Sequence, residues 1–311
     1  MYRYGPERII ISMKQLIYRV IYNSNINLIL RYFNKLLYPI LPNKIKLPPS
    51  GIMKIQNSNG QKLKIFTNQT NYLTQLIFWN GYESFEYTDI FISLIKKVST
   101  FYDIGANIGY YSLLAEMENS NIKVVGFEPA TGPLFYFREN VRLNQFKNIK
   151  IESIALSHKE GEIIFHEIKN KKYSYLEHNL AGESNAGSNT EGRNFVQNKV
   201  TTTTLDSYVK NHHNQPIDLI KMDTEGTEHY ILENADVVLK QMKPIIICET
   251  LFNTIEKELE TIMLKYGYEF YNHTDEGLIQ TKSIIRTYDN GVRNCFFVHP
   301  DKKNLIANYI I

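Results

Sequence analysis

The residues best suited to bind a ligand form a turn at 103–112, which reads DIGANIGYYS. Gly105 and Gly109 permit a tight turn and let a ligand approach the main chain. The turn follows an apolar strand predicted over 100–104 and precedes a helix, so a ligand would rest at the carboxyl edge of a sheet near a helix N-terminus. Asp103 favours a ligand with a cationic group. The spacing differs from the Gly-x-Gly-x-x-Gly of a dinucleotide site, and no Walker lysine follows.

A second acidic residue, Glu128, ends the next predicted strand, over 123–127. A carboxylate in this place can accept hydrogen bonds from both hydroxyls of a ribose. Together with Asp103, it predicts an adenosine ligand that carries a charged amino-acid tail. S-adenosylmethionine fits this description better than NAD does.

Three further carboxylates, those of Asp223, Glu225 and Glu228, follow another predicted strand, and Glu249 ends the one after it. Neighbouring carboxylates raise one another's pKa, which suits a general base. They are also the oxygen ligands that Mg²⁺ and Ca²⁺ prefer. We therefore predict Asp223 as the base, with Glu225 and Glu249 as its partners or, with Asp223, as metal ligands. Acidic residues at a helix N-terminus can also serve only the helix dipole, which is the alternative for Glu228.

Other nucleophiles and ligands are less suited to catalysis. His229 is a weaker candidate base, and the remaining histidines lack the spacing of a zinc site. Cys248 lies in an apolar strand and is predicted to be a core residue. The Asp/Asn-Pro-Pro-Tyr/Phe motif of amino-methylating DNA enzymes is absent at Asp223, and no basic patch follows the predicted site. A nucleic-acid substrate is therefore not expected.

The elements that position these residues alternate between strand and helix. Strands are predicted over 100–104, 123–127, 149–156, 219–222 and 245–248, and helices over 110–117, 134–144, 228–232 and 254–266. This rhythm indicates βαβ units and a mostly parallel sheet. The tail departs from it, because 268–272 and 294–299 predict an antiparallel hairpin at the end of the sheet.

The N-terminal part differs in charge from the rest. The whole chain of 311 residues has a net charge of +3. Residues 1–50 carry eight Lys or Arg against the single acid Glu7. Residues 13–21 place their apolar side chains at helical spacing, so this segment either packs on the main domain or lies as a basic amphipathic helix on an anionic membrane. No apolar run approaches the roughly 20 residues of a spanning helix.

These features divide the chain into a basic helical N-terminal extension (1–50), a small α/β lead-in that could cap the substrate (51–98) and a main domain (99–311). Within the lead-in, 51–67 predicts short strands with a turn at 57–60, and 72–97 predicts helical segments. A polar insertion at 169–198 interrupts the main domain. Long polar insertions are either active-site lids or disordered, and both alternatives stay open here.

Several of these motifs occur together, in order, in one known family. The chain resembles the FkbM-type methyltransferases, a branch of the class I S-adenosylmethionine-dependent enzymes. The matching motifs are DIGANIGYYS (103–112), FEP (127–129), IALS (154–157), TLD (204–206) and DLIKMDTEGTE (218–228). They span about half of the chain. The resemblance implies a Rossmann-like α/β sheet of seven strands, the last antiparallel, and O-methylation of a hydroxyl.

The same resemblance implies which residues hold S-adenosylmethionine. The residues at the matching positions are Asp103, Gly105, Asn107, Gly109, Tyr110, Glu128, Pro129, Ala155 and Asp223. Mg²⁺ bound by Asp223, Glu225 and Glu249 is a further expectation, from the carboxylates themselves.

We expect an O-methyltransferase that acts on a saccharide hydroxyl, in a surface polysaccharide or a lipid-linked glycan. The alternatives are methylation of a small polyketide-like natural product and a non-catalytic protein that retains the cofactor fold. The expected location is the cytoplasm, at the inner face of the membrane if residues 1–50 contact it. The expected partners are a saccharide or small-molecule acceptor and no nucleic acid.

Overall fold

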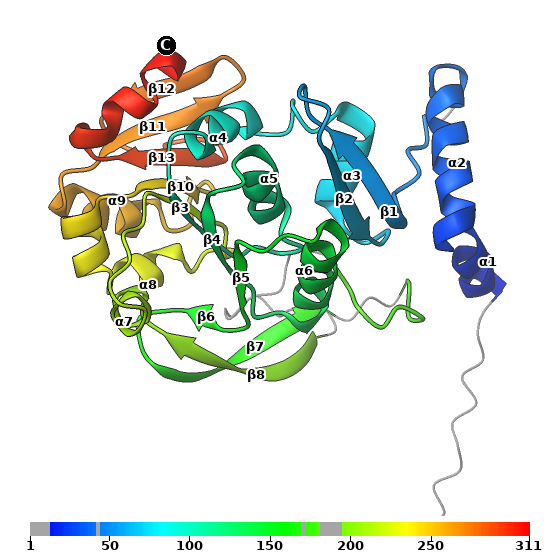
Figure 1. The fold of residues 1–311 in the computed structure, drawn as a ribbon, viewed down its shortest axis with the longest axis horizontal. Coiled ribbons are helices and arrows are strands. Elements are labelled where there is room, and N and C mark those ends of the chain that lie inside the picture. Colours follow the sequence, from blue (N-terminus) through cyan, green and yellow to red (C-terminus); the bar gives the residue numbers. More distant parts are fainter. Residues whose placement is uncertain (1–12, 42–43, 169–171, 181–194) are drawn as a thin grey trace, which may run out of the picture.

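The chain is organised around a central sheet of eight strands (Figure 1). The computed structural model describes residues 13–41, 44–168, 172–180 and 195–311. From one edge to the other, the strands are β12 (Gly277–Thr281), β11 (Glu269–Thr274), β13 (Asn294–Val298), β10 (Ile245–Glu249), β9 (Leu219–Met222), β3 (Thr100–Ile104), β4 (Lys123–Phe127) and β5 (Ile149–Glu152). Strand β13 is antiparallel to both β10 and β11, whereas β10, β9, β3, β4 and β5 are mutually parallel. This is the predicted α/β class.

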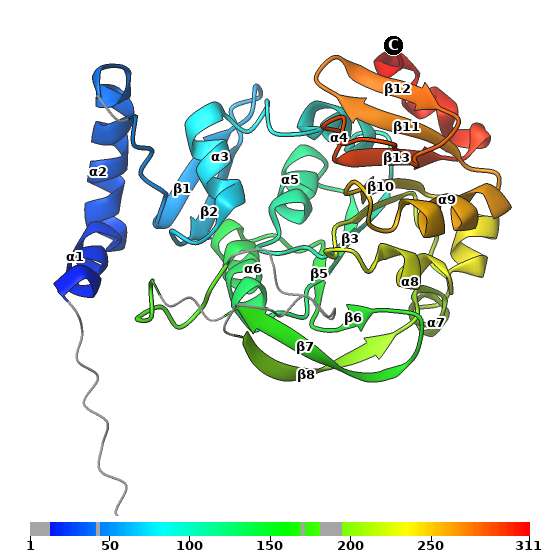
Figure 2. The same cartoon turned by 180° about the vertical axis from the view of Figure 1, so that it is seen from behind.

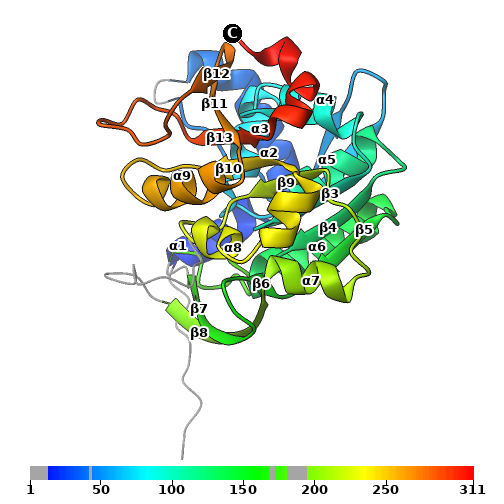
Figure 3. The same cartoon turned by 90° about the vertical axis from the view of Figure 1, so that its left-hand side faces the viewer.

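Helices cover both faces of the sheet, so its strands are apolar on both sides. Phe101 and Leu219 pack into one core and Tyr102 and Ile220 into the other. Figures 2 and 3 show the same layers from behind and from the side. The first core includes residues of α4 (Thr88–Ile95), α5 (Tyr110–Glu118), α6 (Thr131–Asn144), and the 3₁₀ turns Pro300–Leu305 and Ala307–Tyr309. The second includes residues of α7 (Leu205–Asn211), α8 (Glu228–Leu232), α9 (Glu256–Lys265) and the π-helix Val238–Met242.

The sheet differs from the predicted one in its strand number. An eighth strand, β12, pairs antiparallel with β11 through a tight turn in which Thr274 faces Gly277. Of the five residues of β12, only Leu278 is fully buried. A strand at the edge with one core side chain lacks the apolar periodicity by which strands are recognised, which explains why the sequence did not reveal it.

The strand predicted over 149–156 is two strands. β5 ends at Glu152, and β6 (Ala155–Leu156) joins a second sheet with β8 (Phe195–Thr203) and β7 (Gly161–Ile168). β7 and β8 pair antiparallel along eight residues each. Most of their side chains are half-buried or exposed. Because one small sheet has only a small core, its strands leave a weak hydrophobic signal.

The N-terminal part begins with two helices, α1 (Met13–Ile21) and α2 (Ser24–Leu37), and a 3₁₀ turn, Tyr38–Ile40. The hairpin of β1 (Gly51–Gln56) and β2 (Lys62–Thr67) follows, as predicted, and then α3 (Tyr72–Asn80). The hairpin packs on α6, where Asn140 accepts a hydrogen bond from Phe66 N at 2.6 Å. Within the described ranges, no helix combines the length and the hydrophobicity that crossing a bilayer requires.

Most of the predicted polar insertion lies outside the described residues, at 169–171 and 181–194. The described segment 172–180 packs on the lead-in. There, Gln69 donates a hydrogen bond to the Tyr175 hydroxyl at 2.9 Å, and Leu180 N donates to Thr70 at 2.8 Å. The last residues of the insertion belong to β8. Its two interpretations, lid and disorder, stay predictions.

Candidate active site

A cavity of about 800 Å³ opens at the carboxyl ends of β3, β4 and β9. Its walls also include β6, β7 and part of the lead-in between residues 71 and 86. This volume is near the upper end of the roughly 300–1,000 Å³ of ligand pockets. The predicted cofactor residues that line it are Gly105, Asn107, Tyr110, Glu128, Pro129, Ala155 and Asp223. Asp103 and Gly109 lie just outside the lining.

The turn after β3 is fastened to the neighbouring strands. Gly105 N and Ala106 N both donate to the carbonyl oxygen of Phe127 at 3.0 Å. Gly105 has a φ of +73°, and a Cβ atom there would lie 1.9 Å from the carbonyl oxygen of Asp223. Glycine therefore lets the end of β3 touch the end of β9, which brings the turn and the acidic segment into one cavity.

Replacing Gly105 by Ala should destabilise the protein by more than the cost of placing an alanine in a left-handed backbone conformation. Gly291 is the matched control, because its φ is +85° and a Cβ there would meet nothing within 4 Å. We expect Gly291→Ala to lower the melting temperature by about 2–4 °C, for a cost of about 1 kcal/mol. Gly105→Ala should lower it by at least about twice as much, because the backbone must also move. Equal melting temperatures for the two variants would show that the contact with Asp223 is unimportant.

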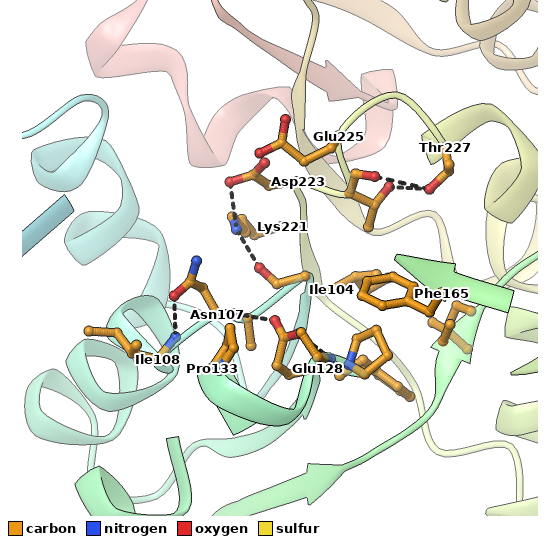
Figure 4. Close-up of a pocket in the computed structure, with 18 of the residues that line it drawn as sticks. Ile104, Asn107, Ile108, Glu128, Pro133, Phe165, Lys221, Asp223, Glu225 and Thr227 are labelled. Atoms are coloured by element: carbon orange, nitrogen blue, oxygen red, sulfur yellow. Dashed lines mark hydrogen bonds and ion pairs between the residues drawn. The ribbon is translucent and has the colours of Figure 1, made fainter. Parts of the chain in front are cut away.

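Glu128 is held in one orientation at the floor of the cavity. Its side chain is buried, and its two oxygens accept hydrogen bonds from Asn107 N at 2.7 Å and Ala130 N at 2.8 Å. Burial raises the pKa of Glu128 to about 8, although both amides lower it. Figure 4 shows this carboxylate beside Asn107 and below Lys221. Each oxygen still has a lone pair that can accept a ligand hydroxyl.

A buried lysine, Lys221, links the turn to the acidic segment. Its ammonium group lies 3.2 Å from Asp223 (Figure 4), 3.1 Å from the carbonyl oxygen of Gly105 and 3.9 Å from Asp103. Burial lowers the pKa of Lys221, but the nearby charges of Asp223 and Asp103 raise it by more than burial lowers it. The net pKa lies above the ordinary lysine value, so the lysine stays protonated. The lysine is thus a fixed positive charge beside the predicted base.

Asp103 is itself enclosed. Ser112 donates to it from both its backbone amide, at 3.1 Å, and its hydroxyl, at 2.7 Å. Burial raises the pKa of Asp103, and the charge of Lys221 offsets part of the rise. The structure therefore places Asp103 where it orients Lys221 and the start of α5, one layer behind the cavity wall.

The predicted acidic residues separate into two groups. Asp223 and Glu225 line the cavity, with their carboxylates side by side (Figure 4). Burial, followed by the charges of Asp223 and Glu228, raises the pKa of Glu225 to about 7. Glu228 instead turns inward and accepts a hydrogen bond from Thr224 N at 2.6 Å, which fastens the segment.

Glu249 does not line the cavity but remains electrostatically close to it. Its half-buried carboxyl has a pKa raised to about 9, first by burial and then by the charges of Asp223, Glu225 and Glu228. At neutral pH Glu249 is therefore mostly protonated and uncharged. The other candidate, His229, is buried in α8, and burial lowers its pKa.

Two residues of this site were not among those predicted. Lys221 stands in the DLIKMDTEGTE motif, and a lysine inside an otherwise apolar strand is a signal that could have identified it. Glu86 also lines the cavity, has a φ of +44° and accepts a hydrogen bond from the Tyr111 hydroxyl at 3.2 Å. Burial and the charge of Asp223 raise its pKa. Its sequence neighbourhood contains no motif, so only the fold reveals it.

The predicted metal ligands do not form a metal site. In the part of the chain that the structure describes, no three His, Cys, Asp or Glu side chains are arranged to hold a metal ion. One reason is that Asp223 is paired with Lys221, and another is that Glu249 lies outside the cavity lining.

Comparison with known proteins gives one sequence match. The model of the methyltransferase FkbM domain family matches residues 103–270, a little more than half of the chain. Curated proteins gave no match.

Solved structures give more distant similarities. An FkbM methyltransferase from Methylobacillus flagellatus KT has 14% identity and a TM-score of 0.42, covering 64% of this chain and 43% of that chain. This chain thus spans less than half of that protein's length. A SAM-dependent methyltransferase from Agrobacterium tumefaciens has 8% identity and a TM-score of 0.41, covering 81% and 71%. TYW2 from P. horikoshii, in complex with MeSAdo, has 13% identity and a TM-score of 0.37, covering 80% and 70%.

Proposed function

This chain belongs to the FkbM methyltransferase family, a family of S-adenosylmethionine-dependent enzymes, and we propose that it methylates a hydroxyl oxygen of a saccharide. The observation that carries the proposal is that one cavity contains both the turn held by Glu128 and the paired carboxylates of Asp223 and Glu225. The first suits an adenosine, and the second suits removal of a proton from a hydroxyl.

The residues present fit S-adenosylmethionine. Glu128 would accept hydrogen bonds from the ribose hydroxyls, and the turn at 105–109 would lie against the amino-acid tail. The negative charges of Asp223, Glu225 and Glu86 around the cavity favour a cationic ligand. When bound, S-adenosylmethionine supplies a methyl group already activated by a positively charged sulfur, so the protein needs to supply alignment and a proton acceptor.

We propose that Asp223 and Glu225 act together as this acceptor. Lys221 holds one oxygen of Asp223, which leaves the other to accept a hydrogen bond from the acceptor hydroxyl. The proton then resides on Glu225, because the pKa of Glu225 is raised to about 7 by burial and by Asp223. A base whose pKa is near the working pH exchanges protons efficiently. In this proposal the carboxylates remove the proton themselves, and the Mg²⁺ that the sequence suggested takes no part.

The cavity also suits a saccharide acceptor. Tyr72, Phe85 and Tyr230 line it together with polar side chains such as Asn71 and Thr227. A sugar ring can lay its C–H face on an aromatic ring and direct its hydroxyls at polar groups. The apolar wall of β7, with Ile163 and Ile164, also suits a polyketide-like acceptor, which is the second candidate.

Activity should depend on pH through Glu225. Because the base must be unprotonated, kcat/KM should rise between about pH 6 and pH 8 and then level off, following the pKa of about 7. Glu225→Gln should remove this rise and lower kcat. The same change at Glu276, an exposed residue of the β11–β12 turn, is the control and should leave the profile intact. A Glu225→Gln enzyme with the parental pH profile would exclude Glu225 as the residue that holds the proton.

The proposed reaction can be tested with methyl-labelled S-adenosylmethionine and a panel of acceptors. Mono- and oligosaccharides, lipid-linked glycans and polyketide-type alcohols should be incubated separately, with and without EDTA. We expect label in a saccharide product as a methyl ether, in equal amounts in both conditions. Label only in a polyketide-type product would replace the saccharide proposal by the second candidate, and loss of activity in EDTA would restore the metal hypothesis.

A further inference from the structure

Helix α2 is mounted with its polar side against the protein. Asn27 and Arg31 are fully buried, although α2 lies at the edge of the molecule beyond the β1–β2 hairpin (Figure 1). Soluble proteins usually dock an amphipathic helix by its apolar stripe. The orientation of α2 is therefore the reverse of the usual one.

Specific hydrogen bonds fix this orientation. Arg31 donates to the carbonyl oxygens of Ser50 at 3.0 Å and Ile52 at 2.6 Å. Asn27 accepts from Ser50 N at 2.7 Å, and Asn34 accepts from Leu47 N at 2.8 Å. These three side chains lie on one helical face, at spacings of four and three residues. The docked side of α2 is thus a set of satisfied polar contacts to the following backbone.

The opposite side of α2 is apolar and exposed. Its side chains are Ile26, Ile29, Leu30, Phe33 and Leu36, which are all exposed, with Ile29 at 71% and Leu36 at 75%. They recur at spacings of three and four residues, so they form one continuous stripe. A contiguous exposed apolar surface of this kind indicates an interaction site.

Helix α1 has an exposed apolar stripe of its own. Its apolar residues Met13, Leu16, Ile17 and Val20 are exposed, while Tyr18 and Arg19 face residues 172–175. The Tyr18 ring lies 5.3 Å from that of Tyr173, and the Arg19 guanidinium lies 5.4 Å from that of Tyr175. Both helices therefore use polar and aromatic side chains to dock and leave their apolar stripes outside.

The charge around these stripes is of one sign. Residues 13–50, which contain both helices, include six Lys or Arg and no Asp or Glu, whereas the whole chain is only +3. One of the six, Arg31, is buried, which leaves five basic side chains around the stripes. The rest of the chain is therefore net negative. Exposed lysines such as Lys14 and Lys44 belong to this region. Binding to a protein partner of ordinary composition does not require basic residues to be concentrated in one part of the chain. An anionic bilayer, by contrast, strongly attracts such a basic segment.

We propose that α1 and α2 form a membrane-docking surface that inserts its apolar stripes into the interfacial layer of an anionic bilayer. The helices would lie in the plane of the interface, with Lys and Arg near the phosphate groups. This orientation explains why the buried side of α2 is polar, because its apolar side would contact lipid and not the protein core. The inference does not depend on the identity of the acceptor.

The test is sedimentation of the full chain with vesicles. Vesicles of equimolar phosphatidylcholine and phosphatidylglycerol should bind the protein, and vesicles of pure phosphatidylcholine should bind it at least about tenfold more weakly. Added NaCl should weaken the binding, because salt screens the charges. The triple variant Ile29→Ser, Phe33→Ser, Leu36→Ser should lose at least about tenfold in vesicle affinity.

A matched control removes equally exposed apolar residues elsewhere. Leu264→Ser, Ile285→Ser and Tyr288→Ser together alter side chains that are exposed to a similar degree, on and after α9. This variant should bind vesicles like the parent. Unchanged S-adenosylmethionine affinity and circular dichroism would show that both triple variants are folded.

Three results would overturn the proposal. One is that the folded parent binds neither kind of vesicle. Another is that the α2 triple variant binds vesicles as well as the parent does. The third is a concentration-dependent dimer in analytical ultracentrifugation that the α2 variant abolishes without vesicle binding by the parent, which would make this surface a contact between two copies of the chain.

Discussion

Replacing Asp223 by Asn should lower kcat by about 10²- to 10⁴-fold, the usual contribution of a positioned acid or base. Asn preserves the size of the side chain but removes the charge that accepts the proton of the hydroxyl. Binding of S-adenosylmethionine should weaken far less, by under about tenfold, because Glu128 and the turn at 105–109 stay intact and only one of the surrounding negative charges is lost. Turnover in methyl-transfer assays and affinity from calorimetry measure the two effects separately.

The control for this substitution is Asp301→Asn. Asp301 also pairs with a lysine, Lys243 at 2.7 Å, but on the exposed surface. The Asp301→Asn variant should retain full turnover. It should also stay folded, because loss of a surface ion pair lowers the free energy of unfolding by only about 0–1 kcal/mol. If Asp223→Asn turned over like the parent, Asp223 would have no part in the chemistry. If it lost cofactor binding equally, its role would be in binding.

Replacing Glu128 by Ala should weaken the binding of S-adenosylmethionine by about 10- to 100-fold. A hydrogen bond contributes about 0.5–1.5 kcal/mol, and the ribose would lose two of them. The substitution also leaves Asn107 N and Ala130 N without their acceptor, which loosens the turn. Both effects act in the same direction, and isothermal titration calorimetry measures their sum.

A second pair of ligands separates the two effects. Adenosine and 2′,3′-dideoxyadenosine differ only in the hydroxyls that Glu128 is proposed to accept. The parent should prefer adenosine, and Glu128→Ala should bind both with equal, weak affinity. A parent that does not discriminate between them would refute the ribose contact and leave Glu128 as a residue that only shapes the turn.

The part of the fold that sequence patterns predicted is its buried core. Strands β3, β4 and β9 were predicted at their observed bounds, because each is a short apolar run between turn residues. β12 and the β6–β7–β8 sheet were not, because few of their side chains are buried. Periodicity reports burial, so elements at the surface leave too little pattern.

The site residues that were predicted are those that belong to recognisable sequence motifs. Asn107, Glu128 and Asp223 come from the ends of successive parallel strands, and parallel strands place their carboxyl ends at one edge. Glu86 was not predictable, because it reaches the cavity through tertiary packing from the lead-in. Nor could the sequence show that Lys221 forms an ion pair with Asp223. This ion pair makes the Asp223 carboxylate less available to a metal ion. Side-chain pairing depends on geometry that spacing does not encode.

The central claim is that this cavity binds S-adenosylmethionine. Calorimetric titration of the full chain with S-adenosylmethionine and with S-adenosylhomocysteine tests it most directly. We expect saturable binding of both ligands at one per chain, with the affinity lowered in Glu128→Ala and retained in Asp223→Asn. A folded protein that binds neither ligand would contradict the account and leave the α/β fold with a different use.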